Sequence, residues 1–334
     1  MIFDTKTAET ILGLIRQYDK IVISRHIRPD GDAVGSSHGL AGLIRLNFPE
    51  KQVRVVGDDH SEYVAFLGPD DEQPEDDFYR GALLIVLDTG SYDRISNEKK
   101  ELAALTVKID HHIVDVPYGD VALVDDTRSS TCELITAFWY HFRSELSIDS
   151  HTALCLYTGM VTDSGRFRFR DVSGETLRCA ASLLDVGFDT EMLYSNLYID
   201  DFSVMKFSSD MVRKVRFTPN GVAYIHVTRA MQEKYGLNNE EASNVISIMD
   251  SIRGSIIWLA FIDNMTPDKD GKMTTRVRLR SRFVTIKELA SRYHGGGHAM
   301  ASGATVYSAR ELRALLGDAD ALIKDYKETH DNWI

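Results

Sequence analysis

The chain has 334 residues, of which 43% are hydrophobic and 26% are charged, and its formal net charge is −12. This length is enough for about two domains, and the composition is that of an ordinary folded protein. The negative charge argues against a protein that coats long duplex nucleic acid through a broad basic surface. It leaves room for a short anionic substrate in a local pocket.

The three cysteines, Cys132, Cys155 and Cys179, form no CxxC pair. An odd number without such a pair argues against a disulfide framework and favours a reducing compartment. The first 20 residues are amphipathic and contain acidic residues, unlike a signal peptide. No run approaches the roughly 20 apolar residues of a membrane span. We therefore expect a cytoplasmic protein that does not bind membranes.

In chain order, the first 190 or so residues alternate short apolar runs with helical patterns. The apolar runs predict strands at 21–24, 52–57, 82–88 and 106–110. Helical patterns lie at 33–47, 130–143 and 149–161. This alternation predicts an α/β domain with a doubly wound, mainly parallel sheet. Such sheets bind ligands at the carboxyl ends of their strands.

The pattern changes in the second half of the chain. Residues 188–214 are helical and mixed in polarity, and we expect them to connect two domains. The turn signal Pro219-Asn220-Gly221 follows, and the runs GVAYIHVT, SIIWLAFIDN and TTRVRLRSRF after it are typical of strands. We predict a first domain at 1–187, a helical linker at 188–214 and a smaller α/β domain at 215–334.

Acidic and imidazole side chains gather at the predicted strand ends. They are His26, Asp30, Asp32, Asp88, Asp110, His111 and His112, and Asp163 follows the helix at 149–161. Four aspartates in one cleft would have to retain protons unless cations neutralise them. A mixed carboxylate and imidazole set suits two Mn²⁺ ions, with Co²⁺ or Mg²⁺ as alternatives. Asp-Gly-Asp alone is also typical of a turn or a helix N-cap, so the prediction depends on the recurrence of the pattern.

The chain resembles the DHH phosphoesterase superfamily, whose four motifs match HIRPDGDAVGSS (26–37), IVLDTG (85–90), DHH (110–112) and TGMVTDSGRF (158–167). The segment GGGHAMASGA (295–304) is similar to the glycine-rich signature of the associated C-terminal domain. The resemblance covers nearly the whole chain. Within the superfamily it is greatest to the bacterial nano-RNase/pAp-phosphatase branch, whose members are often described as exopolyphosphatase-related.

The resemblance implies a role for each matching position of the first domain. His26 and Asp30 are expected to bind one metal, and Asp32, His111 and Asp163 the other. Asp88 is expected to bridge the two ions. Asp110 would orient the histidines, and His112 would face the substrate, stabilise the phosphoryl group or protonate the leaving oxygen.

In the second domain the resemblance implies substrate binding by Arg280 and by Gly295, Gly296, Gly297 and His298. Arg280 is one of four alternating arginines that share a strand face. For the outer two, Arg276 and Arg282, simple exposure to solvent explains the pattern as well as substrate binding does. The family usually has a glycine where this chain has His294. Ser129, Ser130 and Thr131 could bind phosphate, but capping of the following helix is the favoured interpretation.

We predict a metal-dependent phosphoesterase that hydrolyses short oligonucleotides, 3′-phosphoadenosine 5′-phosphate or both with a hydroxide activated by two metals. Alternatives are an exopolyphosphatase or inorganic pyrophosphatase, a cyclic-dinucleotide phosphodiesterase, a RecJ-like nuclease and a non-catalytic nucleotide-binding regulator. Phe283 follows Ser281-Arg282 where class II pyrophosphatases have a lysine, which counts against that alternative. The sequence leaves the oligomeric state open, and a homodimer is one form that it allows.

Overall fold

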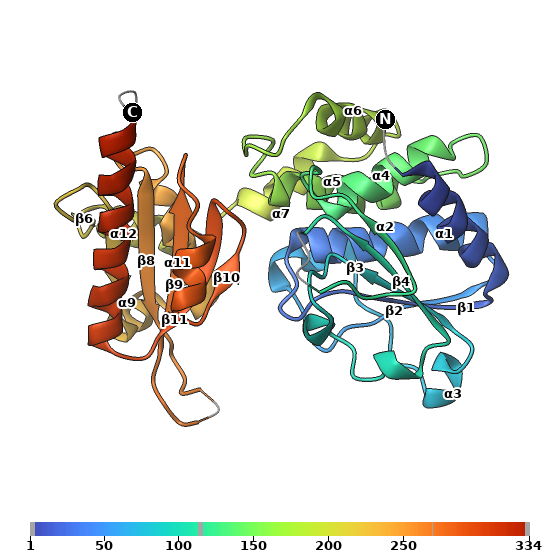
Figure 1. Ribbon diagram of the computed structural model, residues 1–334, viewed down its shortest axis with the longest axis horizontal. Helices are drawn as coiled ribbons and strands as arrows, with labels where there is room; N and C mark the ends of the chain where they lie inside the picture. The colour runs from blue at the N-terminus through green and yellow to red at the C-terminus, as the bar shows by residue number, and fades with distance from the viewer. Residues whose placement is uncertain (1–3, 113–115, 269, 331–334) are drawn as a thin grey trace. The chain divides into compact units, whose positions relative to one another are not determined.

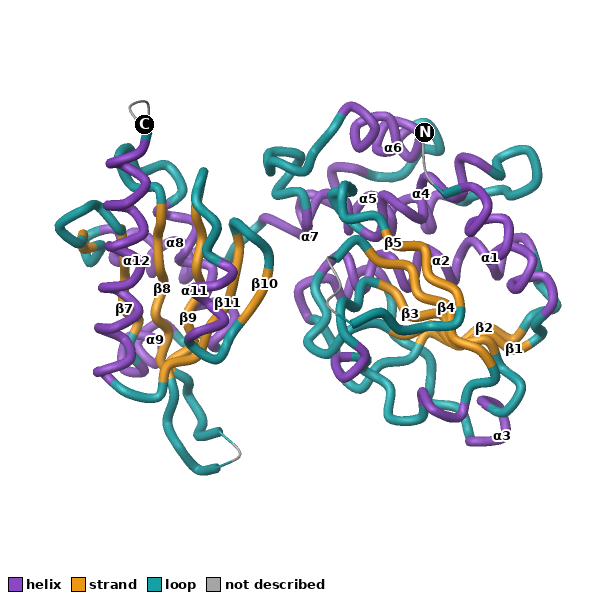
Figure 2. Tube along the Cα trace, viewed as in Figure 1, coloured by secondary structure: helices purple, strands orange, loops and turns teal. Residues whose placement is uncertain are grey.

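The structure is a computed structural model that describes residues 4–112, 116–268 and 270–330. The chain divides into two compact units, Met1–Ile199 and Asp200–Ile334, and each unit has its own sheet (Figure 1, Figure 2). Residues 1–3 of the predicted amphipathic N-terminal segment lie outside the described residues. Within the described residues, no helix is long and apolar enough to cross a membrane.

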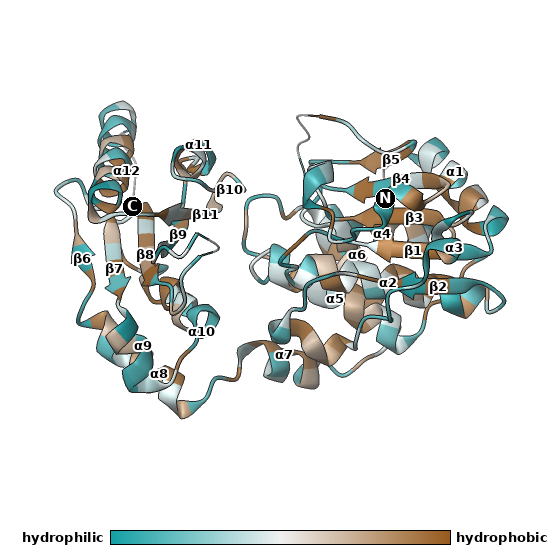
Figure 3. Cartoon of the chain, turned by 90° about the horizontal axis from the view of Figure 1, so that it is seen from below, coloured by the Kyte–Doolittle hydropathy of each residue, from teal (hydrophilic) through white to brown (hydrophobic). Residues whose placement is uncertain are grey.

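The first unit contains a five-stranded sheet with the order β2-β1-β3-β4-β5, in which all neighbouring strands are parallel. The strands are β1 (Lys20–Ser24), β2 (Gln52–Val55), β3 (Leu83–Leu87), β4 (Leu105–Asp110) and β5 (Val121–Val124). β3 is apolar and buried along its whole length, as expected for a strand covered on both faces (Figure 3). The predicted parallel sheet is confirmed. The strand order reverses between β1 and β3, where ligands of such sheets bind.

Helices cover both faces of this sheet (Figure 1). The helices α1 (Thr5–Gln17), α2 (Gly31–Asn47) and α4 (Thr131–His141) pack on one face, and α3 (Asp76–Tyr79) contacts β1 on the other. The helices α5 (Ser150–Asp163) and α6 (Gly174–Leu184) form a further layer on α2 and α4. The N-terminus of α2 and the C-terminus of α5 are thereby brought together.

Two helices occupy the predicted linker, α7 (Thr190–Tyr198) and α8 (Phe202–Val212). Leu193 and Leu197 of α7 belong to the core of the first unit. Val204 and Phe207 of α8 belong to a core of the second unit. Each helix is therefore packed as part of one unit. The domain limits at 187 and 214 stay a prediction.

The second unit contains a six-stranded mixed sheet with the order β10-β11-β9-β8-β7-β6. The strands are β6 (Arg216–Phe217), β7 (Ala223–Val227), β8 (Ile257–Asp263), β9 (Thr275–Ser281), β10 (Gly296–Gly297) and β11 (Ala301–Val306). Its helices are α9 (Arg229–Tyr235), α10 (Asn239–Ser243), α11 (Lys287–Arg292) and α12 (Ala309–Thr329). Apolar cores lie on both faces, and β8 contributes alternate residues to each. The predicted smaller α/β domain is confirmed.

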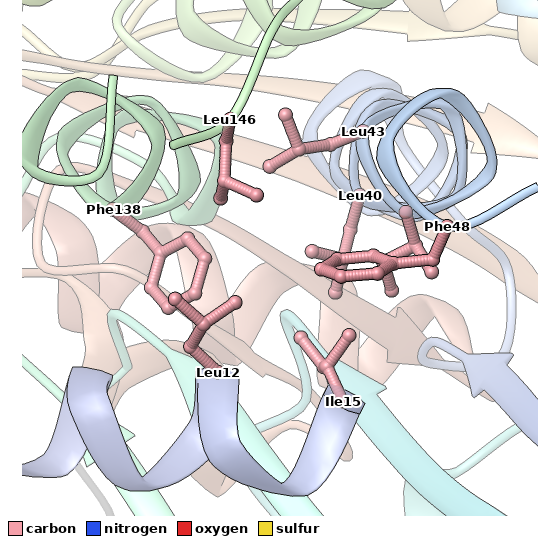
Figure 4. A pocket seen from close by; sticks show the side chains of 8 residues that line it. Leu12, Ile15, Leu40, Leu43, Phe48, Phe138 and Leu146 are labelled. Atoms are coloured by element: carbon pink, nitrogen blue, oxygen red, sulfur yellow. The ribbon is translucent and has the colours of Figure 1, made fainter. Parts of the chain in front are cut away.

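A cavity lies among α1, α2 and α4 in the first unit (Figure 4). Its lining is apolar throughout and consists of Leu12, Ile15, Leu40, Leu43, Ile44, Phe48, Phe138 and Leu146. The α2 residues of this lining belong to the C-terminal half of the helix, whereas Asp30 and Asp32 lie at its N-terminus. The cavity offers no group that binds a phosphate or a cation.

Candidate metal centre

The segment after β1 places an imidazole beside a helix cap. Asp30 is the N-cap of α2, and its Oδ1 accepts the backbone N–H groups of Asp32 and Ala33, each at 3.1 Å. His26 Nδ1 lies 2.8 Å from the carbonyl oxygen of Ile27, which directs Nε2 toward the carboxylates. Nε2 is 3.8 Å from Asp30 Oδ2, the oxygen that does not cap the helix.

Asp88 follows β3 and stands between two groups of donors. Its Oδ2 lies 3.5 Å from His26 Nε2, and its Oδ1 lies 3.5 Å from His111 Nε2. The residue has φ 51°, a left-handed conformation that costs a non-glycine residue roughly 1–2 kcal/mol. Thr131 donates a hydrogen bond from Oγ1 to Asp88 Oδ1 at 3.2 Å. Backbone strain of this kind concentrates at functional sites, where the surrounding contacts hold it in place.

The second group of donors comprises His111, Asp163 and Asp32. His111 Nε2 lies 3.3 Å from Asp163 Oδ2 and 3.9 Å from Asp32 Oδ2. Asp163 is the last residue of α5. The Asp32 carboxylate accepts the backbone N–H groups of Thr131 at 2.7 Å and of Cys132 at 2.9 Å. These donors belong to the N-terminus of α4, where a negative charge is stabilised.

Ser130 caps α4, because its hydroxyl accepts the Glu133 N–H at 3.0 Å. The favoured interpretation of the Ser129-Ser130-Thr131 segment as a helix cap is confirmed for Ser130. Glu133 itself is fully buried and forms an ion pair with Arg128, with Nη1 and Oε1 2.9 Å apart. The carbonyl oxygen of Arg128 lies 3.1 Å from His111 Nδ1, so this buried pair holds the segment that orients the His111 ring.

A second buried ion pair supports His112. Lys108 Nζ lies 3.0 Å from Asp110 Oδ2, and the two side chains are 1% and 0% exposed. Asp110 Oδ1 lies 2.8 Å from His112 Nδ1 and fixes the ring through that nitrogen. Lys108 and Glu133 were not among the predicted site residues. The available signal was a charged residue inside an otherwise apolar strand (TVKID) or helix (TCELITAFW).

The carboxylates and imidazoles shift one another's pKa values strongly. Burial opposes protonation of His26, but Asp30 and Asp88 raise its pKa to about 11. Burial also opposes protonation of His111, while Asp163, Asp88 and Asp32 raise its pKa to about 10. Burial and the Asp88 charge raise the pKa of Asp32 to about 7, and burial raises the pKa of Asp163 well above its usual range. Without cations, the cluster therefore holds protons, and metal ions could supply the same positive charge.

Two sets of side chains could each hold a metal ion, namely His26 with Asp30 and Asp88, and Asp32 with His111 and Asp163. Within each set the ligand atoms lie within 4.8 Å of one another. The donors are aspartate oxygens and imidazole nitrogens, which fit divalent ions such as Mn²⁺. The structure thus brings all six predicted metal ligands together in the first unit, and Asp88 of the first set also faces the second, with its Oδ1 3.5 Å from His111 Nε2. Their role as ligands stays a prediction.

The predicted substrate-binding residues all lie in the second unit. Arg276, Arg278 and Arg280 alternate along β9 with the buried Val277 and Leu279. Arg280 is opposite Trp258 of β8 in the sheet register. Burial lowers the pKa of Arg280, and no carboxylate forms an ion pair with it in the part of the chain that the structure describes.

Arg282, the last arginine of this series, has a structural role. Arg282 lies just beyond β9, where its guanidinium carbon is 4.8 Å from the Trp258 ring centroid and its Nη2 donates to the Asp250 carbonyl oxygen. These contacts explain its presence without a substrate.

The glycine run forms the start of a hairpin. Gly296 and Gly297 make up β10 and pair with Gly303 and Ser302 of β11. The His298 N–H donates to the Ala301 carbonyl oxygen at 2.9 Å, so this backbone donor is already used. His294 has φ 56°, a conformation that favours glycine. His294 therefore adopts the backbone conformation that glycine adopts most easily.

Family models match both halves of the chain. The model of the DHH family N-terminal domain matches residues 20–160, and that of the DHHA1 domain matches residues 221–325. The chain is also 34% identical over 318 residues to the bifunctional oligoribonuclease and PAP phosphatase NrnA of Bacillus subtilis, with 95% of this chain and 99% of that protein covered. The chain belongs to the DHH family. The predicted family and the predicted class, a phosphoesterase, are confirmed.

Other relatives agree with this placement in the DHH family. A probable NrnA of Streptococcus mutans is 34% identical and covers 95% of this chain and 99% of its own length. A crystal structure of an exopolyphosphatase-related protein from Bacteroides fragilis has a TM-score of 0.83 and 23% identity, and 97% of this chain and 99% of that chain are covered. At this identity the structural likeness supports the fold alone.

Proposed function

We propose that this DHH family protein hydrolyses short oligoribonucleotides and 3′-phosphoadenosine 5′-phosphate with two divalent metal ions. The observation that carries the proposal is the position of Asp88, whose two oxygens face His26 and His111 at 3.5 Å each. A carboxylate that faces two neighbouring sets of ligands fits a two-metal phosphoesterase, whose ions lie roughly 3.5–4 Å apart. The names of the relatives, which act as oligoribonucleases and PAP phosphatases, support this substrate class.

When bound, the two ions supply Lewis acidity and activate water as a nucleophile. The residues of the chain hold and orient the reacting groups. Asp110 anchors His112 through Nδ1, so that Nε2 points away from Asp110 and can contact a phosphoryl or leaving oxygen. Arg280 and His298 are proposed to bind the substrate. Mn²⁺ is the proposed ion because the set mixes imidazole with carboxylate donors.

The alternatives differ in substrate and can be separated by one assay panel. The panel contains dinucleotides, longer RNA, 3′-phosphoadenosine 5′-phosphate, a cyclic dinucleotide, pyrophosphate and polyphosphate, each with Mn²⁺. We expect turnover of the dinucleotides and of 3′-phosphoadenosine 5′-phosphate to exceed that of the others. A preference for polyphosphate or pyrophosphate would replace the proposal with the corresponding phosphatase activity.

The two-metal arrangement is tested at Asp88. Asp88→Ala removes the carboxylate whose two oxygens face His26 of one set and His111 of the other, and we expect activity to fall by at least roughly 100-fold because both sites are weakened. Bound metal, measured by mass spectrometry of metals after gel filtration, should fall as well. Asp93→Ala, in the short 3-10 helix η2 (Tyr92–Arg94) that follows, is the control and should leave both quantities unchanged. Normal activity of Asp88→Ala would contradict the shared-ligand arrangement.

A further inference from the structure

A basic loop follows the metal centre in the first unit and has no role in the function proposed above. Asp163 ends α5, and the next residues include Arg166, Arg168 and Arg170, all of them exposed. Phe169, which lies among them, is also 44% exposed. In a chain of net charge −12, three arginines beside a cluster of carboxylates are a local concentration of positive charge.

The loop has a fixed and strained conformation. Gly165, Arg166 and Phe167 have φ values of 56°, 62° and 59°, so that three successive residues are left-handed. The Ser164 hydroxyl accepts the Phe167 N–H at 2.9 Å. The Arg166 N–H donates to the carbonyl oxygen of Val161 at 2.8 Å, which keeps the base of its side chain against the last turn of α5. Conformations of this kind persist where the surroundings hold them, often at binding sites.

The Arg166 side chain is positioned by a tyrosine rather than by a carboxylate. Its guanidinium carbon lies 4.2 Å from the ring centroid of Tyr198, at the end of α7. Among the residues that the structure describes, no carboxylate forms an ion pair with Arg166. A guanidinium that lies over an aromatic ring without a carboxylate partner can still donate its N–H groups to a phosphate.

The helix that carries Tyr198 also contacts the segment that follows β2. The short helix η1 (Glu62–Leu67) packs against α7. The place of Tyr198 is therefore held from within the first unit.

We propose that Arg166, held on Tyr198, binds a phosphate of the substrate that is not cleaved. The substrate's reacting phosphate would lie at the metal centre, and the phosphate of the neighbouring nucleotide would meet the guanidinium. The Tyr198 ring is itself held by stacking with Tyr194, with 6.1 Å between the ring centroids. This subsite belongs to the first unit. It rests on the proposed function, because it requires an oligonucleotide substrate.

The test follows cleavage of the internucleotide bond in three dinucleotides. ApA has only the scissile phosphate, whereas pApA and ApAp each carry one more at opposite ends. In the wild type, the added phosphate at one end should lower KM. In Arg166→Ala this advantage should fall by roughly tenfold to a hundredfold, the effect of one charge-assisted contact. Arg166→Lys should recover part of it, because lysine keeps the charge without the planar donor edge.

Arg143→Ala is the matched control. Arg143 is also exposed, and its guanidinium carbon lies 4.0 Å from the ring centroid of Tyr140 in α4. The two substitutions therefore remove the same kind of arginine–tyrosine contact, but only Arg166 adjoins the metal centre. Arg143→Ala should leave the preference for the phosphorylated dinucleotide unchanged. Metal content and melting temperature should stay at wild-type values in Arg166→Ala.

The outcomes separate the inference from the proposed function. Wild-type protein that hydrolyses none of the three dinucleotides would contradict the proposed function, and the inference with it. Wild-type turnover with an unchanged phosphate preference in Arg166→Ala would overturn the inference alone. An equal loss on ApA and on its phosphorylated forms, or a loss of metal, would also overturn it, because Arg166 would then act on the metal centre itself.

Discussion

Asp30 combines two tasks that the sequence left as alternatives, a helix cap and a position at the metal centre. Oδ1 accepts two backbone N–H groups of α2, and Oδ2 faces His26 at 3.8 Å. The two tasks are compatible because a carboxylate has two oxygens. The sequence could indicate most of the predicted ligands because they follow a strand or lie at a helix N-terminus, and Asp163 because it ends a helix. Lys108 and Glu133 could not be indicated in this way, because their importance depends on burial and on partners such as Thr176, 43 residues from Glu133.

Breaking the buried Lys108–Asp110 pair should destabilise the protein strongly. In Lys108→Met, Asp110 would keep a buried charge with His112 at Oδ1 but no cation at Oδ2, and we expect a loss of roughly 3–5 kcal/mol in the free energy of unfolding. The double variant Lys108→Met/Asp110→Asn should recover part of this loss, since the unpaired charge is gone. Urea unfolding measures both. Lys324→Met is the control, because its ion pair with Glu328 is exposed on both sides. An equal effect of the two lysine substitutions would contradict the role of burial.

Metal binding should depend on pH through the two histidines. The pKa values of His26 and His111, about 11 and about 10, mean that both rings carry protons at neutral pH when no cation is bound. A metal ligand must be a neutral imidazole, so binding displaces these protons and the affinity should rise with pH. We expect the Mn²⁺ affinity to increase roughly tenfold or more per pH unit between about pH 6 and 8. Calorimetry in buffers of different ionisation enthalpy counts the released protons. An affinity independent of pH would show that the rings are neutral before the metal binds.

At the scale of elements, the small residues after the Asp-Gly-Asp turn let two helices approach closely. α2 carries Gly31, Gly35, Gly39 and Gly42 on the side that meets α5. A Cβ on Gly35 would lie 2.5 Å from the carbonyl oxygen of Cys155. This close packing brings the N-terminus of α2, with Asp32, to the C-terminus of α5, with Asp163. The glycines thus help to bring together two predicted metal ligands, Asp32 and Asp163, that are 131 residues apart in the sequence.

Gly35→Ala should therefore impair both stability and metal binding. The added methyl group meets backbone atoms, which cannot move aside cheaply, and we expect a loss of roughly 1–3 kcal/mol in the free energy of unfolding. The Mn²⁺ affinity should weaken too, because α2 would shift relative to α5. The control is Gly13→Ala in α1, where a Cβ has nothing within 4 Å and the position is exposed. That change should stabilise the protein by about 0.5–1 kcal/mol. Equal effects of both substitutions in urea unfolding would contradict the packing argument.

The elements that sequence reasoning identified best are those with long apolar runs or clear periodicity. The predicted strands at 21–24, 82–88 and 106–110 correspond to β1, β3 and β4 within two residues at each end. β5, β6, β10 and β11 were not predicted. β5 has four residues of which only one is fully buried, and β10 consists of two glycines. Short edge strands like these are defined by the partner strand, and their own residues carry little pattern.

At the scale of the whole molecule, charge should limit the length of substrate. The net charge of −12 opposes each phosphate that extends beyond the local arginines and the metal centre. We expect kcat/KM to be highest for RNA of two to three nucleotides and to fall as the chain lengthens. Salt screens the long-range repulsion between a long RNA and a negative protein surface strongly. It screens the close contacts inside a site much less.

The ratio of kcat/KM for a long RNA to that for a dinucleotide should therefore rise with salt. Between roughly 0.01 and 0.15 M ionic strength the Debye length falls from about 30 to about 8 Å, so a repulsion that acts over longer distances is largely removed. The measurement uses a dinucleotide and a 24-nucleotide single strand at constant Mn²⁺. The dinucleotide serves as the internal control, since both substrates share the chemistry at the metal centre. A ratio that falls with salt would instead mean that long RNA is attracted to the protein, as in a nuclease with an extended basic channel, and would restore the RecJ-like alternative.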